Sequence, residues 1–259
     1  MAIVSMNKIS KKFSNDIHAL RDISVDFAEG SMTAILGPSG AGKSTMLRII
    51  NGLVMPTSGE VKVGDRVVNR STLREVRGEV GMIFQHYNLV TRLSVMTNVL
   101  TGRLKYRSWL GSMLYLFSNK DMDYAFQALD RVGLLDRAWD RADRLSGGQQ
   151  QRVGIARALA QQPRVILADE PVASLDPVTS EEILQLLRDI CDRDGITVIV
   201  NLHQAALAKR FASRIIGLKA GEIIFDDSPE KFDQYYFDQI YHKKESNDEK
   251  QLAPSLAYS

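Results

Sequence analysis

The chain has 259 residues, enough for one large α/β domain or two smaller ones to bury a core without disulfides. Hydrophobic residues make up 44% and charged residues 25%, values that exclude the disordered and collagen-like classes. The formal net charge is only +2, from 33 basic and 31 acidic residues. The chain lacks the strong positive field with which proteins hold nucleic acids, so we expect no nucleic-acid partner.

The cysteine content and the absence of a secretory signal predict the cellular compartment of the protein. Cys191 is the one cysteine and lies among apolar residues at helical spacing, which predicts a buried thiol in a reducing compartment. A catalytic cysteine is the alternative, but no paired His or Asn signature accompanies it. The amino terminus lacks a basic start followed by a long apolar run, and no segment reaches the roughly 18 apolar residues that span a bilayer. We expect a cytoplasmic protein whose membrane role requires a partner.

The first part of the chain alternates strands, loops and one helix. β-branched runs at 24–27 and 33–36 predict strands. After a Gly-rich loop, apolar residues recur at helical spacing over 46–53. A hairpin-like stretch at 59–68 and a strand at 80–84 follow. This order predicts a strand, a loop and a helix at the start of an α/β core.

The periodicity becomes helical from about residue 89 to residue 160, which predicts a helical subdomain inserted in the core. One predicted apolar stripe contains Tyr124, Leu129, Val132 and Leu135. The core resumes with a strand at 164–168, a helix to about residue 192 and a strand at 197–200, an alternation typical of a parallel sheet. Residues 243–259 are polar and aperiodic, which predicts a flexible tail.

The Gly-rich loop matches the phosphate-binding pattern G-x-x-x-x-G-K-[ST] and stands between the predicted strand and helix, as that motif requires. Its residues are Gly37, Pro38, Ser39, Gly40, Ala41, Gly42, Lys43, Ser44 and Thr45. The glycines let backbone N–H groups converge on phosphates at a helix start. Lys43 adds a positive charge near the β- and γ-phosphates, and Ser44 offers a hydroxyl to Mg²⁺. The strand–loop–helix context disfavours a chance Gly-rich turn.

Two carboxylates, Asp169 and Glu170, end the strand at 164–168. Ligands of open α/β sheets bind at the carboxyl ends of strands, so these acids belong beside the phosphate loop rather than in solvent. Asp169 suits the metal, because Mg²⁺ prefers carboxylate and hydroxyl oxygens and Ser44 supplies the second ligand. Glu170 suits the orientation or deprotonation of the attacking water.

Residues 145–149, Leu-Ser-Gly-Gly-Gln, are similar to the signature motif of ATP-binding cassette ATPases and lie upstream of Asp169 as in that family. The resemblance covers roughly residues 3 to 225 and includes the motifs in order. It implies ATP and Mg²⁺ as ligands. It also implies an α/β fold: over residues 1–242, a P-loop NTPase core of mostly parallel sheet with an antiparallel β subdomain and the inserted helical subdomain.

The resemblance assigns further roles one position at a time. Phe13 resembles the aromatic that stacks on adenine, although a ring at a strand end is often a core residue. Gln85 resembles the glutamine that reaches Mg²⁺ at the joint with the helical subdomain, with a surface glutamine as the alternative. Asp176 lies in the loop that crosses the dimer seam. His203 resembles the histidine that contacts the γ-phosphate; a lone His after a strand is more often structural.

The signature residues are remote from the phosphate loop in the sequence, so one chain cannot easily close its own site. They are Ser146, Gly147, Gly148 and Gln149, and they offer a hydroxyl and N–H groups at a helix start. In the family such residues bind the γ-phosphate held by the opposite protomer. The resemblance therefore implies a head-to-tail homodimer with ATP between its halves, closed by ATP and reopened by hydrolysis.

A narrower resemblance concerns the cargo. Residues 168–177, 201–204 and 217–221 are similar to the ATPases of bacterial phosphonate importers. This implies an ATP hydrolase coupled to uptake of phosphonate, with phosphite or phosphate analogues as close neighbours. The implied partners are integral membrane permease subunits and, indirectly, a periplasmic or lipid-anchored solute-binding protein. The implied location is the cytoplasmic face of the inner membrane, as a peripheral protein.

The segment 103–118 lies where importer ATPases receive a coupling helix from the membrane subunit. It is apolar on a helical stripe with basic residues at its start. Packing inside the subdomain is the alternative.

Rival functions lack their own signatures. A soluble cassette ATPase of DNA maintenance carries a long coiled coil, and no heptads persist here. A translation factor of this class needs two cassettes, whereas the sequence has one phosphate loop. A GTPase needs Asn-Lys-x-Asp, and residues 119–122, Asn-Lys-Asp-Met, place the acid one position early. An ATPase subunit for a different transported substrate remains open.

Overall fold

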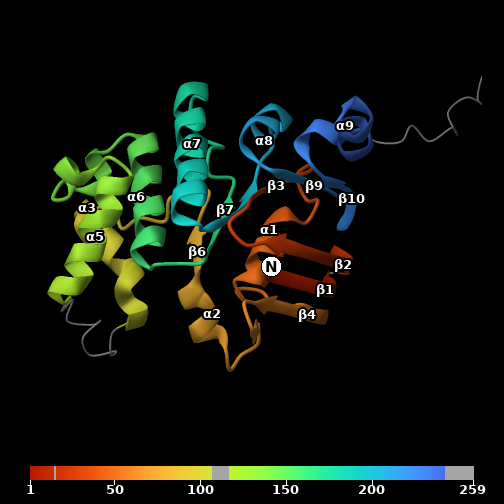
Figure 1. Cartoon of the computed structure of the whole chain (residues 1–259), viewed down its shortest axis with the longest axis horizontal. Helices are drawn as coiled ribbons and strands as arrows, with labels where there is room; N and C mark the ends of the chain where they lie inside the picture. The colour runs from red at the N-terminus through yellow and green to blue at the C-terminus, as the bar shows by residue number, and fades with distance from the viewer. Residues whose placement is uncertain (15, 107–116, 243–259) are drawn as a thin grey trace, which may run out of the picture.

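The computed structural model describes residues 1–14, 16–106 and 117–242 (Figure 1). The predicted tail at 243–259 and most of the segment at 103–118 therefore lie outside the described residues, and the expectations made for them stay predictions.

Two sheets form the body of the molecule (Figure 1). The smaller one is a 4-stranded antiparallel sheet in the order β2-β1-β4-β5. Its strands are β1 (Ala2–Lys12), β2 (His18–Ala28), β4 (Ser58–Val63) and β5 (Arg66–Val67). The antiparallel β subdomain is thus confirmed, and the hairpin predicted at 59–68 is its β4–β5 pair.

The larger sheet has 6 strands in the order β10-β9-β3-β8-β7-β6. Every neighbouring pair from β9 to β6 is parallel, and β10 adds an antiparallel edge. Its strands are β3 (Met32–Leu36), β6 (Val80–Ile83), β7 (Val165–Asp169), β8 (Thr197–Asn201), β9 (Arg214–Lys219) and β10 (Glu222–Asp227). All residues of β3, β7 and β8 are buried, as expected for strands covered on both faces.

Two hydrophobic cores lie on opposite faces of this sheet, because side chains alternate along each strand. Val165 and Leu167 face the core that contains α1 (Lys43–Ile50) and the inner side of the 4-stranded sheet, so α1 packs between the two sheets. Ile166 and Ala168 face the core that contains the other main helices. The helix that follows the phosphate loop, α1, is therefore packed against the larger sheet on one side and the smaller sheet on the other.

The remaining helices cover the second face or form the helical group beside it, apart from α2 (Leu73–Glu79), whose Val76 packs in the same core as α1 (Figure 1). Across the described residues, none has both the length and the apolar character that crossing a bilayer requires. They are α2 (Leu73–Glu79), α3 (Val95–Leu100), η1 (Thr101–Tyr106), α5 (Asn119–Arg131), η2 (Leu135–Arg137), η3 (Ala142–Arg144), α6 (Gly147–Ala160), α7 (Pro177–Asp194), α8 (Ala205–Phe211), η4 (Pro229–Lys231) and α9 (Gln234–Tyr241).

The apolar stripe predicted in the helical group is right only in part. Leu129 and Val132 are buried in the core, but Leu135 is 45% exposed. The reason is that α5 ends at Arg131 and Gly133 adopts a φ of 69°, which redirects the chain before Leu135. The prediction that the apolar stripe of the helix continues beyond Gly133 to Leu135 was therefore wrong.

A buried ion pair links the elements of the helical group. Arg103 Nε lies 3.0 Å from Asp121 Oδ1, and its guanidinium also donates to the Ala160 carbonyl at 2.9 Å. The rings of Tyr106 and Tyr124 lie 4.0 and 4.5 Å from the guanidinium carbon. The pair joins η1, α5 and α6, so this basic residue at the start of the 103–118 segment is structural. Asp121, the acid of the failed GTPase match, belongs to the capping box of α5.

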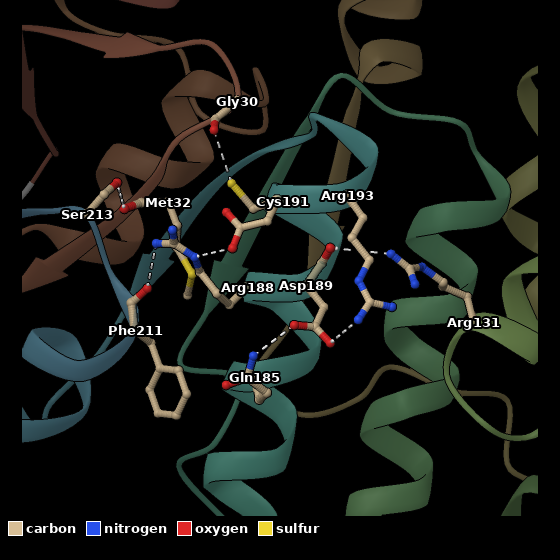
Figure 2. A network of polar contacts seen from close by, with 11 residues as sticks. Gly30, Met32, Arg131, Gln185, Arg188, Asp189, Cys191, Arg193, Phe211 and Ser213 are labelled. Atoms are coloured by element: carbon tan, nitrogen blue, oxygen red, sulfur yellow. Dashed lines mark hydrogen bonds and ion pairs between the residues drawn. The ribbon is translucent and has the colours of Figure 1, made fainter.

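Helix α7 is held to three neighbouring elements near its carboxyl end (Figure 2). Cys191 Sγ donates to the Gly30 carbonyl at 3.4 Å, Arg188 donates to the Phe211 carbonyl of α8 at 3.2 Å, and Arg131 of α5 donates to an α7 carbonyl at 3.3 Å. Burial raises the pKa of the Cys191 thiol, so it stays protonated at neutral pH. The buried free thiol predicted from the sequence is confirmed.

Candidate functional site

The phosphate loop connects β3 to α1 through backbone that requires glycine. Gly37 has a φ of 156° and Gly42 a φ of 108°. A Cβ at Gly37 would lie 2.3 Å from the Leu218 carbonyl oxygen, and one at Gly42 would lie 2.3 Å from the Ala19 carbonyl oxygen. The two glycines therefore seat the loop against neighbouring backbone. Around Gly40, by contrast, nothing lies within 4 Å of a built Cβ, so this part of the loop faces open space.

A pocket of about 290 Å³ lies over the loop. Residues 39–45 line it together with Phe13 and Glu170. Phe13 is 39% exposed, with the Lys11 ammonium 5.1 Å from its ring centroid, so the ring faces the pocket and is not a core side chain. The pocket therefore has phosphate-loop amides on one wall and an available aromatic face on another.

Lys43 is folded back over the loop that carries it. Its ammonium is buried and donates to the carbonyls of Gly37 at 2.7 Å and Pro38 at 3.2 Å. Burial lowers the pKa of Lys43, while the nearby carboxylates of Glu170 and Asp169 act in the opposite direction. The cation thus lies between the loop and both acids.

Asp169 is fixed from three directions at the end of β7. Its Oδ1 accepts hydrogen bonds from Ser44 Oγ and from Asn201 Nδ2, each at 2.8 Å. Its Oδ2 lies 3.9 Å from the guanidinium of Arg48 on α1. The structure therefore brings together Ser44 and Asp169, two of the three residues that sequence reasoning assigned to a metal.

Glu170 and His203 form the second contact of the site. His203 Nε2 lies 2.6 Å from Glu170 Oε1. Glu170 has a φ of 52°, a conformation that few non-glycine residues adopt and that often marks a functional position. Its side chain lines the phosphate-loop pocket and also a second pocket of about 170 Å³, shared with Asn201 and His203. The two acids and the histidine thus meet at the carboxyl ends of adjacent strands β7 and β8.

The structure places Gln85 and Asp176 at two edges of this centre. Gln85 is exposed and follows β6, the strand that pairs with β7. Asp176 is the N-cap of α7 and accepts a hydrogen bond from Thr179 N at 3.0 Å. Hydrogen bonds from Thr179 are the main reason that the pKa of Asp176 is lowered.

The signature residues form the first turn of α6 in the helical group. Ser146 and Gln149 complete a capping box: Gln149 N donates to Ser146 Oγ at 3.3 Å, and Ser146 N donates to Gln149 Oε1 at 3.0 Å. Gly148 lies against Thr179 of α7, whose Cγ2 is 2.5 Å from a built Cβ. Gly147 lies against the Tyr87 hydroxyl. The phosphate-loop pocket, by contrast, is lined by described residues of 13–45 and Glu170.

Comparisons with known proteins agree with this geometry. The family described as ABC transporter matches residues 20–173. A phosphonates import ATP-binding protein of Thiobacillus denitrificans is 58% identical over 259 residues, covering 100% of both chains. The chain belongs to the ABC transporter family. This ABC protein is also 51% identical to a phosphite import ATP-binding protein of Stutzerimonas stutzeri, over 93% of this chain and 87% of that one.

Solved structures show the same fold. A dimeric ATP-binding cassette in a post-hydrolysis state, bound to ADP and Pi, is 37% identical with a TM-score of 0.76, over 87% of this chain and 98% of that one. A cassette from Clostridium perfringens, part of the transporter complex cbiONQ, is 28% identical with a TM-score of 0.80, over 92% and 93% of the two chains. The P-loop NTPase core predicted for this ABC protein is confirmed.

Sequence reasoning missed two residues that contact the Asp169 carboxylate. Asn201 is fully buried and holds Asp169, and Arg48 approaches the same carboxylate from α1. Asn201 had a visible signal, since a polar residue ends an otherwise apolar strand beside the strand of Asp169. Arg48 had none, because an arginine on a helix after a phosphate loop is most often a solvated side chain.

Proposed function

We propose that this ABC protein is the ATP-hydrolysing subunit of a membrane importer for phosphonate or a related phosphorus oxyanion. The observation that carries the proposal is the convergence of Ser44 on Asp169 and of His203 on Glu170 around one phosphate-loop pocket. Such an arrangement joins a phosphate cradle, a metal site and a general base, which are the parts that phosphoryl transfer to water requires.

The described residues fit ATP with Mg²⁺. Ser44 Oγ and Asp169 Oδ1 are hard oxygen ligands 2.8 Å apart, and Asn201 leaves its buried Oδ1 without a hydrogen-bond partner among the described residues, which marks a polar position at this edge. Ser44 and Asp169, together with Gln85, would hold the ion. When bound, Mg²⁺ supplies positive charge that offsets the charge of the β- and γ-phosphates.

Protein groups bind the nucleotide and carry out the remaining steps of hydrolysis. The loop amides and Lys43 bind the phosphates, and Phe13 offers its ring to adenine. Glu170 accepts the proton of the water that attacks the γ-phosphorus, and His203, held on Glu170, orients that water and the γ-phosphate. The bond from the γ-phosphorus to the bridging oxygen breaks, and ADP and phosphate leave.

The working unit that we propose is a homodimer with ATP in its interface. The signature residues Ser146 to Gln149 present a helix start on the helical group, away from the pocket of their own chain. Two copies related by a two-fold axis would each lend that helix start to the other's γ-phosphate, with Asp176 at the seam. The dimeric state of the relative bound to ADP and Pi supports this arrangement.

The importer role rests on the relatives. Their names specify import of phosphonates and of phosphite, and the identity to the phosphonate protein is 58% against 51% for the phosphite protein. We therefore propose phosphonate as cargo, with this chain bound to integral membrane permease subunits at the cytoplasmic face and supplied by a solute-binding protein outside. We propose that residues 1–242 are the cassette, with 89–160 as its helical subdomain.

The test has a biochemical arm and a cellular arm. The purified chain should hydrolyse ATP with Mg²⁺, and Lys43→Ala should abolish hydrolysis because the phosphates lose their nearest cation. Cells that depend on this chain should grow on a phosphonate as sole phosphorus source and should fail with Lys43→Ala. Arg21→Ala, on an exposed strand position, is the matched control and should behave as wild type. Normal turnover of Lys43→Ala would refute the site, and growth on phosphite alone would refute the cargo.

A further inference from the structure

Helix α9 is docked firmly against the far edge of the larger sheet. Ile240 is fully buried, and its Cδ1 lies 2.2 Å from the point where a Cβ on Gly217 would stand. The Lys219 ammonium, from β9, donates to the carbonyl of Gln239 and to that of His242 at 2.8 Å. A lysine at these last carbonyls caps the helix end. The position of the last turn of α9 is therefore set by β9, the strand that pairs with β3.

The last residue of α9 reaches the nucleotide site through its hydroxyl. Tyr241 Oη accepts a hydrogen bond from Gly37 N at 3.2 Å and donates one to the His203 carbonyl at 3.3 Å. Burial raises the pKa of Tyr241, so the hydroxyl stays protonated at neutral pH and serves as acceptor and donor at once. One side chain thus connects the first residue of the phosphate loop to the residue that contacts Glu170.

Both bonded groups need this partner. Gly37 is buried, and an unpaired buried N–H is costly. His203 follows β8 in a loop segment, and its side chain is 44% exposed, so packing alone does little to restrain it. With its carbonyl held by Tyr241, the imidazole starts from a fixed backbone and reaches Glu170 at 2.6 Å.

We propose that Tyr241 is a positioning residue for ATP hydrolysis, which fixes the backbone of His203 relative to the phosphate loop. The inference rests on the proposed function of the site. Tyr241 acts through His203, since its hydroxyl holds the His203 carbonyl and ties that carbonyl to Gly37 N at the start of the phosphate loop. It therefore sets how often the imidazole is correctly placed, while the loop amides and Lys43 determine how well ATP binds.

The first experiment removes only the hydroxyl. Tyr241→Phe keeps the ring and its packing on Phe237, whose centroid is 4.7 Å away. We expect kcat for ATP hydrolysis to fall about 5- to 10-fold, the effect of losing an ordinary hydrogen bond, with KM for ATP changed less than about twofold. Tyr235→Phe is the matched control, because Tyr235 is on the same helix and 63% exposed. It should leave both constants unchanged.

The second experiment separates positioning from a general loss of stability. In a His203→Ala background, where the residual rate is followed by single-turnover hydrolysis of labelled ATP, Tyr241→Phe should have no further effect. Three results would overturn the proposal. One is that Tyr241→Phe lowers the rate by the same factor in the wild-type and His203→Ala backgrounds. The others are that it raises KM for ATP without lowering kcat, or that it has the same constants as Tyr235→Phe. If the wild type itself hydrolyses no ATP, the proposed function and this inference both fail. If the wild type hydrolyses ATP and Lys43→Ala does not, the proposed function holds and the result tests the role of Tyr241 alone.

Discussion

The two halves of the candidate site differ in how complete they are within one chain. In the core half, Lys43, Asp169, Glu170 and His203 contact the loop, each other or their supports over distances of 2.6 to 2.8 Å. In the helical half, the hydrogen bonds of the signature serine to described residues stay within its own turn, through the capping box with Gln149. The groups of the core half are thus already in contact with one another or with their supports. The helix start of the helical half, by contrast, does not line the phosphate-loop pocket of its own chain.

This difference teaches how the chemistry is controlled. A site whose catalytic groups are preorganised pays little to arrange them during the reaction, and such preorganisation is a main source of rate acceleration. A site that also needs a helix start from elsewhere hydrolyses ATP only after that part arrives. On the proposed function, we therefore expect the core half to set the rate of the chemical step and the helical half to set when that step takes place.

The largest effect on this comparison is expected from Glu170→Gln, which disables the core half alone. Hydrolysis should slow by about 10²- to 10⁴-fold, because a general base is lost while the side-chain shape remains. ATP binding should persist, so the variant should accumulate as an ATP-dependent dimer. Size-exclusion chromatography with light scattering in saturating Mg-ATP measures this, and a monomer under those conditions would contradict the interface role of the signature turn.

A mixing experiment tests whether the halves come from different chains. Lys43→Ala disables the core half and Ser146→Arg the helical half, so each homodimer should be inactive. In an equal mixture half of the dimers are mixed, and each has one intact site, so about a quarter of the wild-type rate should return. Mixing Lys43→Ala with Glu170→Gln is the control, since both changes fall in the same half and restore nothing. An ATPase assay showing equal recovery in the two mixtures would rule out sharing between chains.

A smaller effect is expected from Asn201→Ala, which loosens one support of the core half. Asp169 would lose one of two hydrogen bonds to its Oδ1, so hydrolysis should fall about tenfold and the Mg²⁺ concentration for half-maximal rate should rise. Val200→Ala, one residue earlier in β8, is the matched control: it makes a cavity without touching Asp169. Mg²⁺ titrations that coincide for both variants would show that the asparagine acts only through packing.

Sequence reasoning predicted the core half well because its signals are local. The phosphate loop and the acids after β7 are short runs whose chemistry depends on a strand end and a helix start, and both features follow from periodicity. The fold class followed from the alternation of strands and helices. The confirmed fold class and the site residues that the structure brings together share one property, which is that neighbours in the chain decide them.

Contacts between distant parts of the chain were out of reach. Tyr241 meets Gly37 across 204 residues, and no pattern in a terminal helix indicates that its last hydroxyl bonds a loop amide. Arg103 is a basic residue at the start of the segment placed where a coupling helix docks, yet it pairs with Asp121 inside the helical group. Leu135 was assigned to a stripe that Gly133 interrupts. For Tyr241 and Arg103 the tertiary partner decided the outcome, whereas for Leu135 a glycine with positive φ ended the helical period.

The contact between Gly148 and Thr179 has a mechanical consequence. A Cβ at Gly148 would lie 2.5 Å from the threonine methyl, so the start of α6 and the start of α7 touch without an intervening layer. Helix α7 begins at Pro177, with Asp176 as its N-cap, a few positions after Glu170 in the same connection from β7. On the proposed function, the surface that a protomer lends to its partner and the base that it keeps are therefore coupled through this helix contact. We expect a displacement at one catalytic centre to be transmitted to the other through the body of a single chain.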